Sequence, residues 1–261
     1  MSRNSENSIA GHTVTAAAMS RTLCCMADTA TAKVLIRFFK TGPGEYGEGD
    51  RFHGIRVPQL RKLVPMFASA PLNELIDLLH SPFHEERQLS LLVMTRQFEN
   101  QTGDAGCEEI YRAYRQNSAF INNWDLVDLS APRIVGGYLF TRSRAELDLM
   151  AASPLIWDRR IAIVATHFFI KNDRFEETQR IAKRLLADSE DLIRKATGWM
   201  LREMGKRDMA TLERFLCDNM DQMSRTTLRY AIERFPEKRR REYLKGTVSI
   251  GKKRPQGADG R

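Results

Sequence analysis

An all-α protein built from repeated helix pairs is predicted by three features of this 261-residue sequence. Apolar residues recur at the i, i+3 and i+4 spacing of helices through most of the chain. No segment has the strict apolar–polar alternation of a strand, and no Asn-Gly hairpin turn occurs. A similar helical segment also returns at a nearly constant interval, as in solenoid proteins. We therefore expect a right-handed superhelical α-solenoid of HEAT-like repeats with a concave ligand surface.

The predicted helices are separated by turn-forming residues. The glycine-rich stretch 42–49 follows the first helix, Pro71 and Pro82 flank the third, and Gly103 comes before the fifth. In this part of the chain the predicted helices are residues 32–40, 58–67, 72–80, 85–98, 108–116 and 123–129. Gly136, Pro154 and Pro236 separate or end those that follow. The later helices are residues 133–138, 145–152, 158–169, 175–187, 190–204, 209–220 and 225–235.

The repeat consists of a polar turn, a basic residue and an apolar helix. Its copies are SPFHEERQLSLL from residue 81, SPLIWDRRIAIV from 153, DSEDLIRKATGWML from 188 and MSRTTLRYAIERF from 223. With Arg160, Lys195 and Arg229 as marks, the intervals are 35 and 34 residues. This period is typical of HEAT-like helix pairs, although an irregular helical bundle is the alternative.

Composition and charge exclude several classes of protein. No stretch approaches 18 consecutive apolar residues, so we expect no membrane span. The four cysteines lack zinc-type spacing and suit a reducing, cytoplasmic compartment. The net charge of +8 fits a polyanionic partner, but residues 237–261 alone hold nine basic and three acidic residues. We expect a loose extension over residues 1–25, a single repeat domain over 26–245 and a disordered basic tail over 246–261.

The repeat register predicts one surface for Arg160, Lys195 and Trp199. We expect Trp124 and Asp128 beside them, although the register does not itself place these two. Trp124 and Asp128 are one turn apart and share a helix face. Arg160 and Lys195 are equivalent positions, and Trp199 lies one turn beyond Lys195. Cations bind phosphates, and indoles pack on sugars or bases and attract cations. A carboxylate would be repelled by DNA phosphates, so it needs another role, such as stabilising positive charge that develops on a sugar.

Structural roles are the alternative for each of these residues. Trp124 and Trp199 could be core residues, and Asp128 could pair with a neighbouring arginine. Arg159 and Arg194 could belong to a solvated helix start, but cations there oppose the helix dipole and favour a nearby anion. The glycine-rich loop lacks a GK[ST] motif, so we expect no nucleotide cofactor, and we expect no metal.

Four motifs together resemble the AlkD family of DNA alkylation repair enzymes, which are HEAT-like-repeat DNA glycosylases. They are KTGPGEYGEGDRFHGIRVPQLRKL, NNWDLVDLSAPRIVGGYL, IWDRRIAIV and IRKATGWMLREMGKR, and the similarity covers residues 30–235. The resemblance implies excision of cationic N3-alkyladenine and N7-alkylguanine from duplex DNA, without a cofactor and without a deep base pocket.

The resemblance also implies roles for individual residues. Asp128 would be the catalytic carboxylate, Trp124 and Trp199 the indoles that line the cleft, and Arg160 the arginine at a DNA phosphate. Further expected DNA contacts are Arg56, Arg159, Arg194, Lys195 and, in the glycine-rich loop, Tyr46. We expect a cytoplasmic, nucleoid-associated monomer. The alternatives are a non-catalytic binder of damaged or distorted DNA and a HEAT-repeat protein scaffold.

Overall fold

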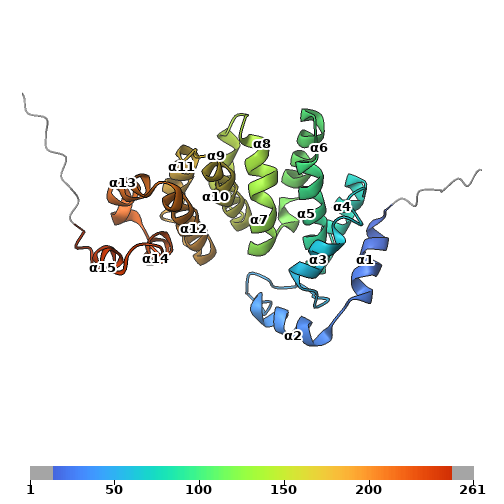
Figure 1. Cartoon of the computed structure of the whole chain (residues 1–261). Helices are drawn as coiled ribbons and strands as arrows, with labels where there is room; N and C mark the ends of the chain where they lie inside the picture. The colour runs from blue at the N-terminus through green and yellow to red at the C-terminus, as the bar shows by residue number, and fades with distance from the viewer. Residues whose placement is uncertain (1–13, 249–261) are drawn as a thin grey trace, which may run out of the picture. The chain divides into compact units, whose positions relative to one another are not determined.

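The computed structural model describes residues 14–248, and its regular structure is helical (Figure 1). Within this range the β-type contact is one isolated bridge between Arg51 and Phe83. The predicted all-α, solenoid-like fold class is confirmed. The chain divides into two compact units between Tyr138 and Leu139, whereas the sequence predicts a single domain over residues 26–245. The superhelix and its concave surface stay predictions.

Helix α5 is the centre of the first unit, and it packs against α1, α3, α4, α6 and α7. Residues 84–95 of α5 are all buried, so its polar start, HEER, must find partners inside the protein. The helices of this unit are α1 Ala16–Cys25, α2 Thr29–Phe38, α3 Val57–Leu63, α4 Leu72–Leu79, α5 His84–Glu99, α6 Asp104–Gln116, η1 Ser118–Phe120, α7 Trp124–Ala131 and η2 Pro132–Gly136. The short α8, Gly137–Leu139, follows η2.

Helix α1 corrects the prediction of a loose extension over residues 1–25. Thr15 caps the helix, and Met19 and Leu23, one turn apart, are fully buried. Ser20 donates a hydrogen bond of 2.7 Å to the Glu86 carboxylate of α5. Tertiary burial therefore stabilises a segment whose Ala- and Thr-rich sequence has weak amphipathic periodicity. Residues 1–13 of the predicted extension lie outside the described residues.

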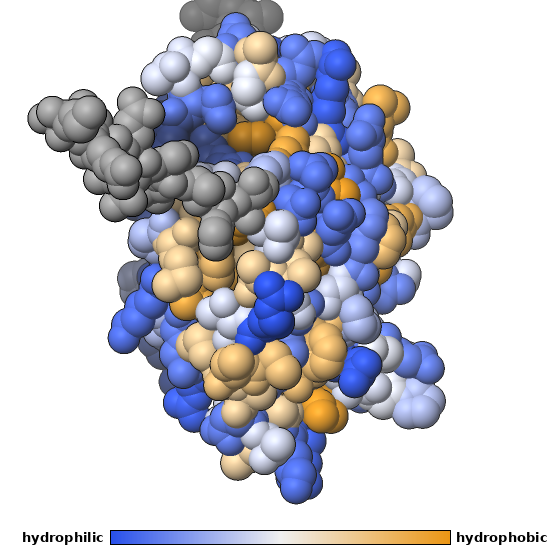
Figure 2. All heavy atoms as spheres, turned by 90° about the vertical axis from the view of Figure 1, so that its right-hand side faces the viewer, coloured by the Kyte–Doolittle hydropathy of each residue, from blue (hydrophilic) through white to orange (hydrophobic). Residues whose placement is uncertain are grey.

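Helix α2 is anchored at both ends, and Phe39, which follows it, is buried against Phe52 with ring centroids 5.4 Å apart. Asp28 caps the helix, with its side chain accepting from Ala30 N at 2.9 Å, and the Asp28 N–H donates to the His53 carbonyl at 2.8 Å. None of the α2 residues is buried, and the large apolar residues Val34 and Phe38 are 65% and 59% exposed. Hydrophobic residues gather at the height of α1 and α2 in the lower half of Figure 2.

Helices α10 and α12 are the long buried helices of the second unit. α12 packs against α10, α11, α13 and α14, and α10 also packs against α9 and α11. Gly198 allows α12 and α14 to approach closely, because a Cβ atom there would lie 2.5 Å from the Thr227 carbonyl. The helices are α9 Ala145–Ala151, α10 Ile156–Lys171, α11 Glu176–Leu185, α12 Asp191–Arg207, α13 Met209–Asn219, η3 Met220–Gln222, α14 Arg225–Ala231 and α15 Glu237–Lys245.

An arginine caps the turn before three of the repeat helices. In each case the guanidinium donates to the backbone carbonyl six residues earlier, at the first residue of the repeat motif. The pairs are Arg87 with Ser81 (2.9 Å), Arg159 with Ser153 (3.1 Å) and Arg194 with Asp188 (2.7 Å). The arginines are 72 and 35 residues apart, so the same contact recurs at one or two repeat periods. Arg159 and Arg194 thus occupy equivalent positions in two repeats and stabilise the same turn in each.

Helix α15 lies beyond the last helix predicted from periodicity. Its sequence, EKRRREYLK, has few apolar residues, but Tyr243 is 1% exposed and packs edge-to-face on Phe235 at 5.4 Å. Gly246 ends the helix with φ of 68°, a left-handed conformation that suits glycine. The predicted basic tail over 246–261 lies outside the described residues after Val248.

Candidate functional site

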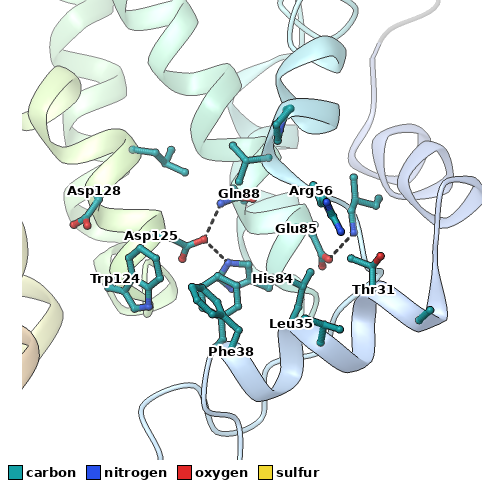
Figure 3. Close-up of a pocket in the computed structure, with 17 residues that line it drawn as sticks. Thr31, Leu35, Phe38, Arg56, His84, Glu85, Gln88, Trp124, Asp125 and Asp128 are labelled. Carbon is teal, nitrogen blue, oxygen red and sulfur yellow. Dashed lines mark hydrogen bonds and ion pairs between the residues drawn. The ribbon is translucent and has the colours of Figure 1, made fainter.

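A pocket of about 850 Å³ opens in the first unit (Figure 3). Its walls come from α2, the segment before α3, the start of α5 and one face of α7. Its lining is Ala30, Thr31, Val34, Leu35, Phe38, Phe39, Ile55, Arg56, Val57, Pro58, His84, Glu85, Gln88, Trp124, Asp125, Asp128 and Leu129. Most of this lining is apolar, and its polar groups come from α2, α5 and α7 and from Arg56 directly before α3.

Helix α7 presents Trp124 and Asp128 to the pocket. Asn123 caps the helix, because its side chain accepts from Trp124 N at 2.8 Å. Trp124 and Asp128 are one turn apart, and both line the pocket and are half-buried. Trp124 is therefore a wall residue rather than part of the closed core. Its ring centroid lies 5.9 Å from that of Phe38 and 5.6 Å from that of Phe39.

The glycine-rich loop reaches the same site through Tyr46. The Trp124 indole Nε1 donates to the Tyr46 hydroxyl at 3.3 Å. The loop is folded by its own backbone, with Gly47 N donating to Lys40 O at 3.1 Å. The loop therefore contacts the pocket wall through Tyr46, and the DNA contact of Tyr46 stays a prediction.

Two carboxylates at the pocket are engaged in hydrogen bonds with other groups of the protein. Glu85 accepts three backbone N–H groups, from His53 (3.0 Å), Gly54 (2.8 Å) and Ile55 (3.1 Å). Asp125 Oδ2 accepts from Gln88 Nε2 and lies against His84 Nε2, at 2.8 Å in both cases (Figure 3). Glu85 thus fixes the chain before α3, and Asp125 fixes the start of α7.

Arg56 is the exposed cation of this pocket. It precedes α3 as its N-cap residue, and its backbone N–H donates to the Gln59 side chain at 3.0 Å. Its side chain lines the pocket beside Glu85 (Figure 3). An exposed guanidinium is suited to a phosphate contact, and the DNA contact of Arg56 stays a prediction.

In the second unit, Arg160 and Lys195 occupy equivalent places at the starts of α10 and α12. Arg160 is 5% exposed, and its Nη1 donates to the Leu192 carbonyl at 2.7 Å. This contact joins two consecutive repeats, so Arg160 contributes to the fold whatever else it binds. Lys195 Nζ pairs with Asp191 of the same helix at 2.7 Å and is 42% exposed.

Trp199 is held by a carboxylate on its own helix. Its Nε1 donates to Glu203 at 3.1 Å, and its ring lies 6.1 Å from that of His167 on α10. Burial raises the pKa of Glu203, but hydrogen bonds from Lys206 and Trp199 more than offset this and hold the pKa below its usual value. Glu203 therefore stays ionised as an acceptor, and Trp199 remains half-buried on α12.

Arg159 has a mainly structural environment. It forms an ion pair with Asp188 at 2.7 Å, and the Arg159 and Asp188 side chains are 16% and 7% exposed. Its guanidinium also donates to the Ser153 and Pro154 carbonyls. Arg194, by its bond to the Asp188 carbonyl, stabilises the same turn. The predicted phosphate contacts of these two arginines thus compete with contacts inside the protein.

Comparison with known proteins identifies the family. The family model for DNA alkylation repair enzymes matches residues 19–235. The chain belongs to the DNA alkylation repair enzyme family. A solved structure described as a predicted DNA alkylation repair enzyme from Enterococcus faecalis is similar, with a TM-score of 0.64 and 16% identity. That match covers 81% of this chain and 97% of the other, and at this identity it shows the fold alone. A search of curated proteins found no match.

Two further observations on the described part of the chain concern metal-binding clusters and membrane-spanning helices. Within residues 14–248, no group of three or more His, Cys, Asp and Glu side chains could hold a metal ion. In the same range, every helix is too short or too polar to cross a membrane. The DNA alkylation repair fold in this protein therefore presents a pocket with aromatic and carboxylate side chains as its candidate site.

Sequence analysis missed the partners of His84. This histidine is 2% exposed and lies between Asp50 and Asp125, which are 34 and 41 residues away in the sequence. The repeats gave no signal for these partners, because the positions equivalent to His84 hold Ile156, Asp191 and Thr226. Only the packing of α5 against the loop and α7 brings the three side chains together.

Proposed function

We propose that this protein is a DNA glycosylase that hydrolyses the N-glycosidic bond of cationic alkylated purines in duplex DNA. The observation that supports this proposal best is the presence of Trp124 and Asp128 on one face of α7, in one pocket. Membership of the DNA alkylation repair enzyme family supports a repair reaction on alkylated DNA. The preferred substrates would be N3-alkyladenine and N7-alkylguanine.

The chemistry follows from the charge of the lesion. Alkylation at N3 or N7 makes the purine cationic, so the base departs readily with the electrons of the glycosidic bond. The sugar then develops oxocarbenium character, which the Asp128 carboxylate would stabilise. Water adds to the sugar carbon and loses a proton, and the products are a free base and an abasic site. Asp128 would also orient this water.

The remaining predicted residues would bind the DNA around the reaction. Trp124 would pack on the sugar and attract the cationic nucleotide, with Trp199 as the second indole. Arg160, Lys195 and Arg56 would contact phosphates. We propose duplex DNA as the partner, bound by a monomer that needs no cofactor and works beside the nucleoid in the cytoplasm.

Base release is the direct test. Purified protein is incubated with methylated duplex DNA, and free N7-methylguanine and N3-methyladenine are measured by mass spectrometry. We expect both bases to be released, with an abasic site left in the duplex. Lesion-dependent binding without release would contradict the enzyme and favour a non-catalytic DNA binder. A log Kd that does not change with log salt would instead favour a protein scaffold, because each phosphate contact contributes about 0.9 to that slope.

Substitution by methionine should change DNA binding at Arg56 but protein stability at Arg159. Arg56→Met is expected to lower the salt slope of DNA binding by about 1 and to leave the stability unchanged, because the side chain is exposed. Arg159→Met is expected to lower the free energy of unfolding by about 3 kcal/mol, because it leaves the buried Asp188 carboxylate unpaired. Denaturant titration and salt-dependent binding measure the two effects, and equal stability losses would contradict the assignment.

A further inference from the structure

A buried ionic network lies directly behind the aromatic wall of the pocket. His84, the first residue of α5, places Nδ1 3.2 Å from Asp50 Oδ2 and Nε2 2.8 Å from Asp125 Oδ2. Neutral imidazole has one N–H and can donate to one of these acceptors, whereas imidazolium can donate to both. The geometry around His84 therefore fits the protonated ring.

The groups that face His84 carry a net negative charge. Asp50 comes from the glycine-rich loop and Asp125 from α7, and Arg87 of α5 is the nearby cation, with its Nη2 2.6 Å from Asp50 Oδ1. The rings of Phe39 and Phe52, at 4.6 Å and 5.0 Å, pack against the imidazole without adding charge. The site thus places two carboxylates and one guanidinium around one imidazole.

These charges raise the pKa of His84. Burial alone would lower it, and Arg87 opposes protonation, but the charge and hydrogen bond of Asp125 and the hydrogen bond of Asp50 raise the pKa to about 9. For Asp50, burial would raise the pKa, but the hydrogen bond from His84 and the charge of Arg87 lower it overall. His84 and Asp50 are therefore both ionised at neutral pH.

The network connects the two elements that hold Trp124. Asp125 directly follows Trp124 at the start of α7, and Asp128 lies one turn later. Asp50 ends the loop that carries Tyr46, whose hydroxyl accepts from the Trp124 indole. Phe39 stands between the two rings, 4.6 Å from His84 and 5.6 Å from Trp124. His84 therefore bridges the loop and the start of α7 through two carboxylates. Asn123, which caps α7, adds a direct hydrogen bond, because its Nδ2 donates to Asp50 Oδ2 at 3.4 Å.

We propose that His84, as an imidazolium shared by Asp50 and Asp125, is a positioning residue that fixes Trp124 and Asp128 in the pocket. The proposal rests on the proposed function for its catalytic consequence. His84 acts through Asp125 and Asp50 and does not take part in bond cleavage. Loss of its charge should release the start of α7 from the loop and displace the Trp124 indole.

The pH dependence has a defined sign. Because the pKa of His84 in the folded protein is raised from 6.5 to about 9, its stabilising contribution is complete below about pH 6.5. That contribution is lost as the pH rises through about 9. The geometry of Trp124 should change over the same upper range.

The test follows the imidazole and the indole separately by NMR of the full chain. The ring nitrogens of His84, assigned with His84→Gln, should stay protonated through pH 8 and titrate near 9. The Nε1–H resonance of Trp124, assigned with Trp124→Phe, should move with the same midpoint. Titration of His84 near its ordinary value, or a Trp124 resonance that ignores the His84 transition, would overturn the proposal.

Two variants sharpen this test without relying on turnover. Asp125→Asn removes one carboxylate, so the shared midpoint of His84 and Trp124 should move down by at least about one pH unit. His53→Gln is the matched control, because His53 is also buried and pairs with a carboxylate, Glu86, at 2.9 Å, but does not line the pocket. The control should leave the Trp124 transition unchanged, and an equal effect of both variants would contradict a specific role for His84.

Activity supplies an independent comparison. If bases are released, the single-turnover rate should fall above pH 8 with the midpoint seen for Trp124. The midpoint in Asp125→Asn should fall in parallel, and a rate that stays constant through pH 10 would contradict the positioning role. If no base is released, the proposed function fails, whereas the linked titration of His84 and Trp124 still decides whether His84 positions the pocket wall.

Discussion

Replacement of Asp128 by asparagine is expected to reduce base release by about 10²–10³-fold, the usual cost of removing one preorganised electrostatic contact to a transition state. The amide keeps the size of the side chain but removes the negative charge that would stabilise the oxocarbenium-like sugar. DNA binding should persist or tighten slightly, because a carboxylate near phosphates opposes binding. Single-turnover release from methylated duplex measures the rate, and fluorescence anisotropy measures the affinity.

A control variant shows whether the effect comes from the position of Asp128 or from the loss of one negative charge anywhere in the protein. Asp221→Asn makes the same chemical change at an exposed position in η3. We expect its release rate and its affinity to equal those of the unmodified protein. Near-normal release by Asp128→Asn would contradict the catalytic role of Asp128, and loss of thermal stability in that variant would indicate a structural role instead.

Gly54→Ala is expected to lower the free energy of unfolding by more than about 3 kcal/mol and to loosen α2, since it combines backbone strain with a collision. Gly54 has φ of +88°, and a Cβ atom there would lie 2.0 Å from the Asp28 carbonyl and 2.7 Å from Ala32 N. These contacts lie at the start of α2, whose own residues are not buried. Denaturant titration gives the stability, and hydrogen exchange reports on α2.

Gly44→Ala is the control for this prediction. Gly44 has φ of +75°, but no atom lies within 4 Å of its expected Cβ position. This variant should therefore show the conformational cost alone, about 1–2 kcal/mol. If Gly54→Ala is no more destabilising than Gly44→Ala, close packing of the chain against α2 is not what requires glycine at residue 54. Displacement of α2 should also weaken DNA binding in Gly54→Ala, because α2 forms one wall of the pocket.

The regular elements were largely predictable because helical periodicity is a local property. Predicted segments such as residues 85–98 and 190–204 correspond to α5 and α12 within a few residues at each end. The misses have a common cause. α1 has weak amphipathic periodicity and α15 has few apolar residues, and each is stabilised by contacts with distant helices, for example Ser20 with Glu86 and Arg239 with Glu213.

For the candidate site, the sequence determined which residues share a helix face. The i, i+4 spacing of Trp124 and Asp128 was enough to place both on one side of α7, and the repeat interval related Arg160 to Lys195. The sequence did not predict the different contacts that Arg159 and Arg160 make inside the protein. Adjacent residues on a helix point in different directions, and only packing showed that Arg159 caps the turn with Asp188 while Arg160 bonds to Leu192.

The tertiary structure decided what surrounds these residues. It alone placed α2 opposite α7 across a pocket and brought His84 between two carboxylates more than 30 residues away in sequence. The helical class, the repeat interval, the family motifs and the shared face of Trp124 and Asp128 were all readable without the structure. The difference is physical. Helix periodicity and face depend on residues three or four positions apart, whereas the partner of a buried charge depends on how whole helices pack.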